Sequence, residues 1–126
     1  MSLSNDGAVA VVLLASVDAA NTAAATGSGV PISAYEGFLE ITQNIGTVTG
    51  GSISGKIQEC DDTAGNNPVD VTGATFTQIT TSNDPATQMI RVPLGLITKT
   101  HIRYIGTIAT GPAAVGVTMR AKAKYI

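Results

Sequence analysis

Four carboxylates surround a predicted turn near the middle of the chain and could bind Ca²⁺. They are Glu59, Asp61, Asp62 and Asp70. Ca²⁺ takes several oxygen ligands from carboxylates, amides and backbone carbonyls. The spacing does not match an EF-hand loop, because Thr63, Ala64 and Gly65 occupy positions that should carry ligands. We therefore interpret the segment as a solvated acidic turn and keep a Ca²⁺ site as the alternative.

The other residues capable of site chemistry are single. His101 is the only histidine and Cys60 the only cysteine, so one chain cannot form a disulfide or a thiolate metal site. No serine, cysteine or lysine lies in a context that would activate it beside a general base. Neighbouring carboxylates raise the pKa of a thiol such as Cys60. We expect a protein that is not an enzyme and needs no cofactor.

Charges are strongly segregated along the 126 residues, although the net charge is only -2. All nine carboxylates lie between Asp6 and Asp84 with Lys56 as the only cation among them, which gives that half -8, while residues 85–126 carry six cations. Arg120, Lys122 and Lys124 form an alternating basic row. The row either pairs with acidic strands of the same sheet or forms a contact with another protein subunit. Nucleic acid is not an expected partner, since the row is short and the total charge negative.

Alternation with a period of two dominates the chain and predicts strands. It is clearest at residues 37–45, 53–58 and 115–124, and further strands are predicted at 74–79, 88–93 and 102–109. Eight side chains are predicted to point inward: Leu39, Ile41, Ile57, Phe76, Ile102, Tyr104, Val115 and Val117. The Gly- and Thr-rich residues 46–51 are predicted to close a hairpin between the strands on either side.

These elements predict an all-β fold, a single-domain β-sandwich of jelly-roll type with about seven or eight strands. No helix-length amphipathic segment is present, and residues 16–29 favour an extended or loop conformation. Residues 1–7 are expected to form an N-terminal arm that is ordered only on a partner, and residues 8–126 the sandwich domain. The apolar residues 8–15 are predicted to form a buried strand. No cation precedes them, so we expect neither a secretory leader nor a membrane span.

Four short motifs in order resemble small structural proteins of tailed bacteriophages, a capsid decoration or cement-like family. They are Tyr35-Glu36-Gly37, the strand end Lys56-Ile57-Gln58-Glu59-Cys60-Asp61-Asp62, the strand Ala74-Thr75-Phe76-Thr77-Gln78, and Ile102-Arg103-Tyr104-Ile105. Within the motifs, Cys60 stands where the family usually has a small hydroxyl residue. Residues 63–67 also lack the aromatic residue often found in that loop.

The resemblance implies a β-sandwich virion component without catalytic residues. As a cement protein it would bind the major capsid protein as a homotrimer on the capsid surface, after synthesis in the bacterial host cytoplasm. The alternative is a carbohydrate- or receptor-binding module of a phage tail or head fibre. Only five aromatic residues and no tryptophan are available for stacking on sugars, which disfavours this alternative.

Overall fold

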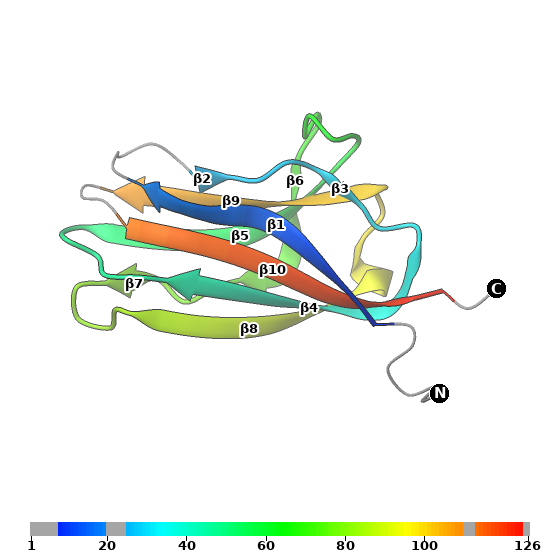
Figure 1. Ribbon diagram of the computed structural model, residues 1–126. Coiled ribbons are helices and arrows are strands. Elements are labelled where there is room, and N and C mark those ends of the chain that lie inside the picture. Colours follow the sequence, from blue (N-terminus) through cyan, green and yellow to red (C-terminus); the bar gives the residue numbers. More distant parts are fainter. Residues whose placement is uncertain (1–7, 20–24, 110–112, 125–126) are drawn as a thin grey trace.

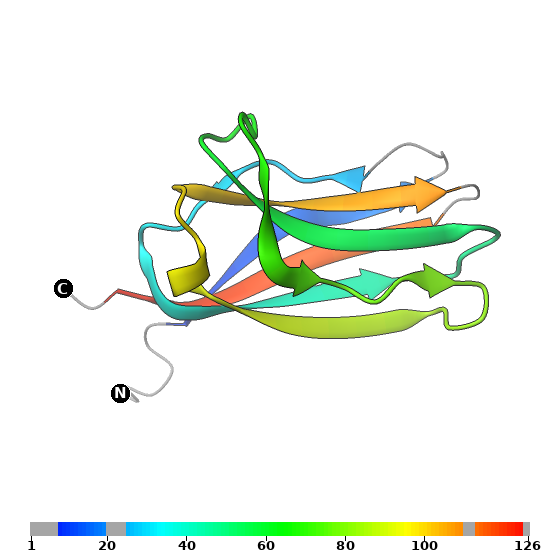
Figure 2. The ribbon, with the colours of Figure 1, turned by 180° about the vertical axis from the view of Figure 1, so that it is seen from behind.

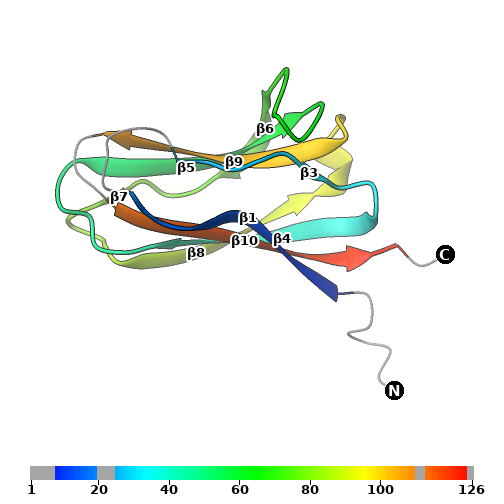
Figure 3. The same ribbon diagram turned by 45° about the horizontal axis from the view of Figure 1, so that its top comes forward.

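The computed structural model describes residues 8–19, 25–109 and 113–124. They form two antiparallel sheets packed face to face, seen as two layers in Figure 3. The first sheet has the order β1 (Ala8–Ala19), β10 (Ala113–Ala123), β4 (Tyr35–Ile45) and β8 (Ala86–Pro93). Residues 1–7, predicted to form an arm, lie outside the described residues.

The second sheet is built on two long central strands with split strands at its edges. Its centre pairs β9 (His101–Ala109) with β5 (Ser52–Cys60). On the free edge of β9 lie β2 (Ala25–Thr26) and β3 (Val30–Pro31), and on the free edge of β5 lie β6 (Val69–Thr75) and β7 (Ile79–Thr80). Figures 1 and 2 show this sheet from its two sides, with the 3₁₀ turn Leu94–Leu96 leading from β8 to β9.

The connectivity is that of a jelly roll. The split edges β2/β3 and β6/β7 each occupy one position, so the ten strands fill eight positions. Numbered along the chain, these positions run 1-8-3-6 in one sheet and 2-7-4-5 in the other. This is the double Greek-key arrangement of eight-stranded jelly rolls. The predicted fold class is confirmed.

The core lies between the two sheets and is filled by the inward side chains of alternating strands. All eight residues predicted to point inward are buried, and none is more than 6% exposed. The rings of Phe76 and Tyr104 meet edge to face with centroids 6.2 Å apart. Tyr104 lies over the register pair Gly55 and Gly106, and a Cβ at either glycine would overlap its ring. The absence of these two side chains gives the tyrosine its place in the core.

The predicted hairpin over residues 46–51 is wrong. β4 belongs to the first sheet and β5 to the second, so this segment crosses from one layer to the other. Sheets in a sandwich lie about 10 Å apart, a distance that six residues span easily. Val48 is buried, and its amide donates to the Asp84 carboxylate at 2.6 Å, which holds the crossing against the end of the sandwich.

Two predicted strands have different limits or surroundings. The predicted strand 74–79 is interrupted: β6 begins at Val69 and ends at Thr75, and β7 starts only at Ile79. Between them Thr77 donates its amide to the Gln88 side chain rather than to a ladder. The predicted buried strand 8–15 is instead the start of an edge strand, β1, where Leu13 is buried and Val12 is 59% exposed.

The first and last strands of the fold are neighbours. β1 and β10 run antiparallel, with Ala8 opposite Lys122 and Ala19 opposite Ala113. Two register shifts, between Val12 and Leu14 and between Leu14 and Val17, each place one extra residue in β1. Such bulges bend and twist an edge strand. In the described part of the chain, no helix is long and apolar enough to cross a membrane.

Candidate functional site

Glu59, at the end of β5, is buried and bound by the turn that precedes β9. Its Oε1 accepts hydrogen bonds from the amide of Thr98 at 2.8 Å, the hydroxyl of Thr98 at 3.0 Å and the amide of Lys99 at 2.8 Å. Burial opposes ionisation, but the bonds from Thr98 and Lys99 outweigh it and hold the pKa of Glu59 below its ordinary value. Glu59 therefore fixes a turn.

Asp61 and Asp62 order the loop that links β5 to β6, which projects beyond the second sheet (Figure 1). Asp61 accepts from Asn67 at 2.7 Å and pairs with Lys99 at 3.0 Å, and these two contacts lower its pKa. Asp62 accepts from the amide and the side chain of Asn66 at 3.1 and 2.6 Å, which lowers its pKa likewise. Both carboxylates bond within the loop.

Asp70 lies on β6 and faces across to β5. It accepts from Gln58 at 2.9 Å and from Lys56 at 3.0 Å, and both contacts lower its pKa. Within the described ranges, no three or more histidine, cysteine, aspartate or glutamate side chains are grouped so that they could hold a metal ion. The four carboxylates considered as Ca²⁺ ligands thus each have protein partners and are not brought to one point.

Cys60 and His101 stand opposite each other in the ladder between β5 and β9, but they are not arranged as a nucleophile and a general base. Cys60 is fully buried, its thiol lies 3.5 Å from the backbone oxygen of Asp62, and burial raises its pKa. His101 has Nδ1 2.8 Å from the hydroxyl of Thr100. The two residues pack where β5 ends and β9 begins, and their contacts are structural.

The basic row lies on the outer face of the first sheet, on β10 and just beyond it. Lys122 pairs with Glu36 at 3.6 Å, and Arg120 stands opposite Glu40 in the ladder. Glu40 forms its ion pair with Arg91 of β8 at 3.3 Å. Arg120 and Lys124 have no ion pair among the described residues.

Much of the charge segregation is compensated inside the chain. Three of the four ion pairs in the described structure join a carboxylate before residue 85 to a cation after it, and the fourth joins Lys56 to Asp70. Cross-strand pairing therefore accounts for Lys122 and Arg91, and a contact between the loops after β5 and before β9 accounts for Lys99. Arg103 is held by Gln58, and within the basic row Arg120 and Lys124 are the two cations without an ion pair in the described structure.

Exposed apolar side chains on the same outer face were not singled out from the sequence. Val12 on β1, Phe38 on β4 and Met89 on β8 are 59%, 45% and 49% exposed. Arg91 lies over the Phe38 ring, 4.9 Å from its centroid. The signal was present in the alternation, since Phe38 shares the parity of Glu36 and Glu40 rather than that of the buried Leu39.

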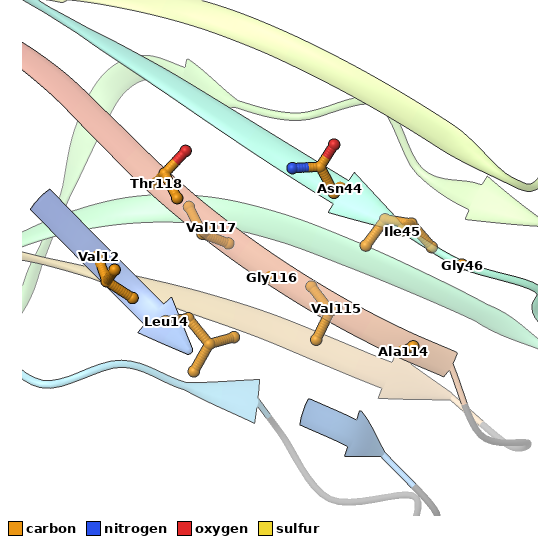
Figure 4. Close-up of a pocket in the computed structure, with 10 residues that line it drawn as sticks. All are labelled: Val12, Leu14, Asn44, Ile45, Gly46, Ala114, Val115, Gly116, Val117 and Thr118. Atoms are coloured by element: carbon orange, nitrogen blue, oxygen red, sulfur yellow. The ribbon is translucent and has the colours of Figure 1, made fainter. Parts of the chain in front are cut away.

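Val12 also lines a pocket of about 570 Å³ that opens between β1, β10 and β4 (Figure 4). It lies at Gly116, which has no side chain and stands opposite the bulged part of β1. Val12 and Leu14 of β1, Thr118 of β10 and Asn44 of β4 surround it. The pocket is thus mainly aliphatic and has few polar groups with which to orient a small ligand.

Among solved structures, this fold matches chains from a virus. A chain in the structure of infectious bursal disease virus Gx strain aligns with a TM-score of 0.55 and 12% identity, over 92% of this chain and 32% of that one. The crystal structure of the infectious bursal disease virus VP2 subviral particle aligns with a TM-score of 0.53, at the same identity and coverage. What they share is the fold.

The present chain spans about one third of the length of those virus chains. No protein-family model matches the sequence, and a search of curated proteins finds no match. The structural likeness therefore concerns the fold alone: the jelly roll described above is also found in chains of virus particles.

Proposed function

We propose that this protein is a virion structural protein, a capsid decoration or cement protein that binds and stabilises the shell built by a major capsid protein. The observation that carries the proposal is the eight-position jelly roll, aligned over 92% of the chain with chains from a virus. The order of the phage-like motifs from Tyr35 onward supports the same role. Binding rather than catalysis fits a site made of ion pairs and an aliphatic pocket.

The proposed location is the outer surface of the capsid, after synthesis in the cytoplasm of a bacterial host. The proposed oligomer is a homotrimer, because cement proteins of the resembling family commonly occupy three-fold junctions of a capsid lattice. Ion pairs within the chain reduce the charge available for contacts between subunits, so shape at the junction would contribute more than charge. Residues 1–7 are proposed to attach to the same partner.

Purified virions separated into heads and tails test the role. Quantitative mass spectrometry should find this protein on heads in large copy number. Adding it back to shells that lack it should raise their melting temperature, since a ligand that binds only the assembled shell stabilises it. Its absence from heads contradicts the proposal, and its presence on tails or fibres favours a carbohydrate- or receptor-binding module.

The trimer is tested separately by light scattering, with the protein in solution and released from heads. A mass of three chains supports it. A monomer in both samples contradicts the trimer and leaves the decoration role standing. Deleting residues 1–6 should weaken attachment to shells and leave the melting temperature of the isolated protein unchanged.

A further inference from the structure

The two outer faces of the sandwich differ in how far their polar groups are satisfied. On the second sheet, Gln78 donates to both Ser52 and Ser54, at 3.3 and 3.2 Å. Asp70 accepts from both Lys56 and Gln58 on the same face. That surface carries two polar clusters, each of which is hydrogen-bonded within itself.

The outer face of the first sheet is more apolar, although Arg91 pairs with Glu40, Lys122 with Glu36 and Thr87 with Asn44 across its strands. Of the five large hydrophobic side chains that are exposed in the described structure, three lie on it, namely Val12, Phe38 and Met89. The register places Val12 opposite Thr118, Thr118 opposite Thr42, and Thr42 opposite Met89. One row across all four strands therefore contains only aliphatic and threonine side chains. Burial of the apolar atoms of this row is favourable, and its two hydroxyls need hydrogen-bond partners on the surface that covers them.

The neighbouring row and its surroundings carry surplus positive charge. Ala10, Arg120, Glu40 and Arg91 stand in register across the sheet. Including Glu36, Lys122 and Lys124, the described side chains of this face hold four cations and two carboxylates, a net charge of +2. The surplus resides in Arg120 and Lys124, which have no ion pair within the described structure. A partner surface that complements this face has to be acidic.

The pocket and the free arginine lie side by side on β10. Thr118 borders the pocket, and Arg120 is two residues further along the same face. Gly116, at which the pocket lies, is four residues from Arg120, or about 13 Å along a strand. An extended segment of a partner could therefore place an aliphatic side chain in the pocket and, four residues away, a carboxylate against Arg120.

We infer that the outer face of the β1-β10-β4-β8 sheet is the docking surface for the shell protein, and that it receives an extended segment with an aliphatic residue and an acidic residue four positions apart. The inference rests on the proposed decoration function and adds the face and the partner chemistry. A second copy docked through the same face would bring together two surfaces that each carry a net charge of +2. Nucleic acid would match the charge but would leave Val12 and Met89 unused.

The test measures binding to isolated shells that lack this protein. Thr118→Arg blocks the mouth of the pocket, Arg120→Glu reverses the free charge, and Met89→Lys interrupts the aliphatic row. The matched controls lie on the other sheet: Thr107→Arg, also an exposed threonine in a central strand, and Lys56→Glu. Melting temperatures identify any variant that fails to fold.

Each of the three variants should weaken shell binding by about tenfold or more, as expected for residues central to an interface. Each control should stay within about twofold of the wild type. Raised salt should weaken the wild type more than Arg120→Glu, because screening acts on the charge that this variant lacks.

If the folded variants bind as the wild type does, or if the controls lose as much, the inference is overturned while the decoration role stands. Dimerisation of the isolated protein that Thr118→Arg abolishes, or retention of duplex DNA that Arg120→Glu abolishes, also overturns it. Failure of the wild-type protein to bind any shell overturns the proposed function itself.

Discussion

The hydroxyl of Tyr104 donates a hydrogen bond to Oε1 of Gln43 at 2.6 Å, in the middle of the core. Tyr104 belongs to β9 of the second sheet and Gln43 to β4 of the first, so this bond joins the two layers. Both side chains are buried, and burial raises the pKa of Tyr104, which keeps its hydroxyl protonated as a donor. Because these two polar groups find each other in an apolar core, their hydrogen bond favours one alignment of the two sheets.

Removing both partners of this pair should cost less than the sum of the two single removals. Tyr104→Phe leaves a buried acceptor without its donor and should lower the free energy of unfolding by about 1–3 kcal/mol. Gln43→Leu should cost a similar amount, and the double variant less than the sum of the two. Urea unfolding of the four proteins measures the coupling. Additive losses would mean that the bond does not contribute to stability.

Gly106, one of the two glycines under the Tyr104 ring, should not tolerate a side chain. A Cβ at Gly106 would lie 2.7 Å from the tyrosine hydroxyl, so Gly106→Ala should cost about 1–3 kcal/mol through overpacking. Gly50→Ala is the control, because nothing lies within 4 Å of its added carbon. Thermal unfolding measures both. In a Tyr104→Phe background the Gly106→Ala penalty should shrink, and an unchanged penalty would locate the clash elsewhere.

Stability should fall on acidification, with Glu59 contributing most clearly. A carboxylate whose pKa is lowered by folding stabilises the protein above its ordinary pKa, 4.5 for glutamate, and loses that effect as the pH falls through the folded value. The lowered pKa values of Asp61, Asp62 and Asp70 act in the same direction. Urea unfolding between pH 7 and pH 3 should show a decline that is smaller in Glu59→Gln.

The control for this series is Glu36→Gln, which removes the same charge from a half-exposed carboxylate whose ion pair within the described ranges is with Lys122 at 3.6 Å. It measures how far the loss of one negative charge alone changes the decline. Equal pH dependence in wild type and Glu59→Gln would show that the bonds from Thr98 and Lys99 do not favour the ionised form.

The loop between β5 and β6 should depend on Gly65 for two separate reasons. Gly65 has a φ of +79°, and a Cβ there would lie 2.6 Å from the guanidinium of Arg103, which Gln58 holds in place at 3.1 Å. Gly73 has a similar φ of +76° but nothing within 4 Å. Gly73→Ala should cost about 1–2 kcal/mol and Gly65→Ala more. In an Arg103→Ala background the two thermal unfolding penalties should become equal.

Alternation in the sequence was enough to predict which side chains form the core. Leu39 and Ile41 on β4 and Ile102 and Tyr104 on β9 are fully buried, as their period of two requires. Local turn chemistry could not show which strands pair. Residues 46–51 have the composition of a hairpin turn, yet they connect different sheets, because sheet membership depends on distant strands such as β8 and β10.

The candidate surface was predictable only in part. Arg120, Lys122 and Lys124 were recognised as a row, but their partners were not, because Glu36 and Glu40 face them through register rather than sequence proximity. The apolar character of residues 8–15 predicts a buried strand. Val12 shows instead that an apolar residue on an edge strand can face outward. The pocket depends on a bulge opposite Gly116, which the sequence does not signal.

The adjacency of β1 and β10 has a practical consequence. Ala8 stands opposite Lys122, so the start of the first strand and the end of the last lie at the same corner of the sandwich (Figure 1). Cargo domains fused before β1 or after β10 would emerge side by side from one point of each copy. A short linker between those strands would also permit circular permutation, with new ends opened in a surface turn while all eight strand positions keep their neighbours.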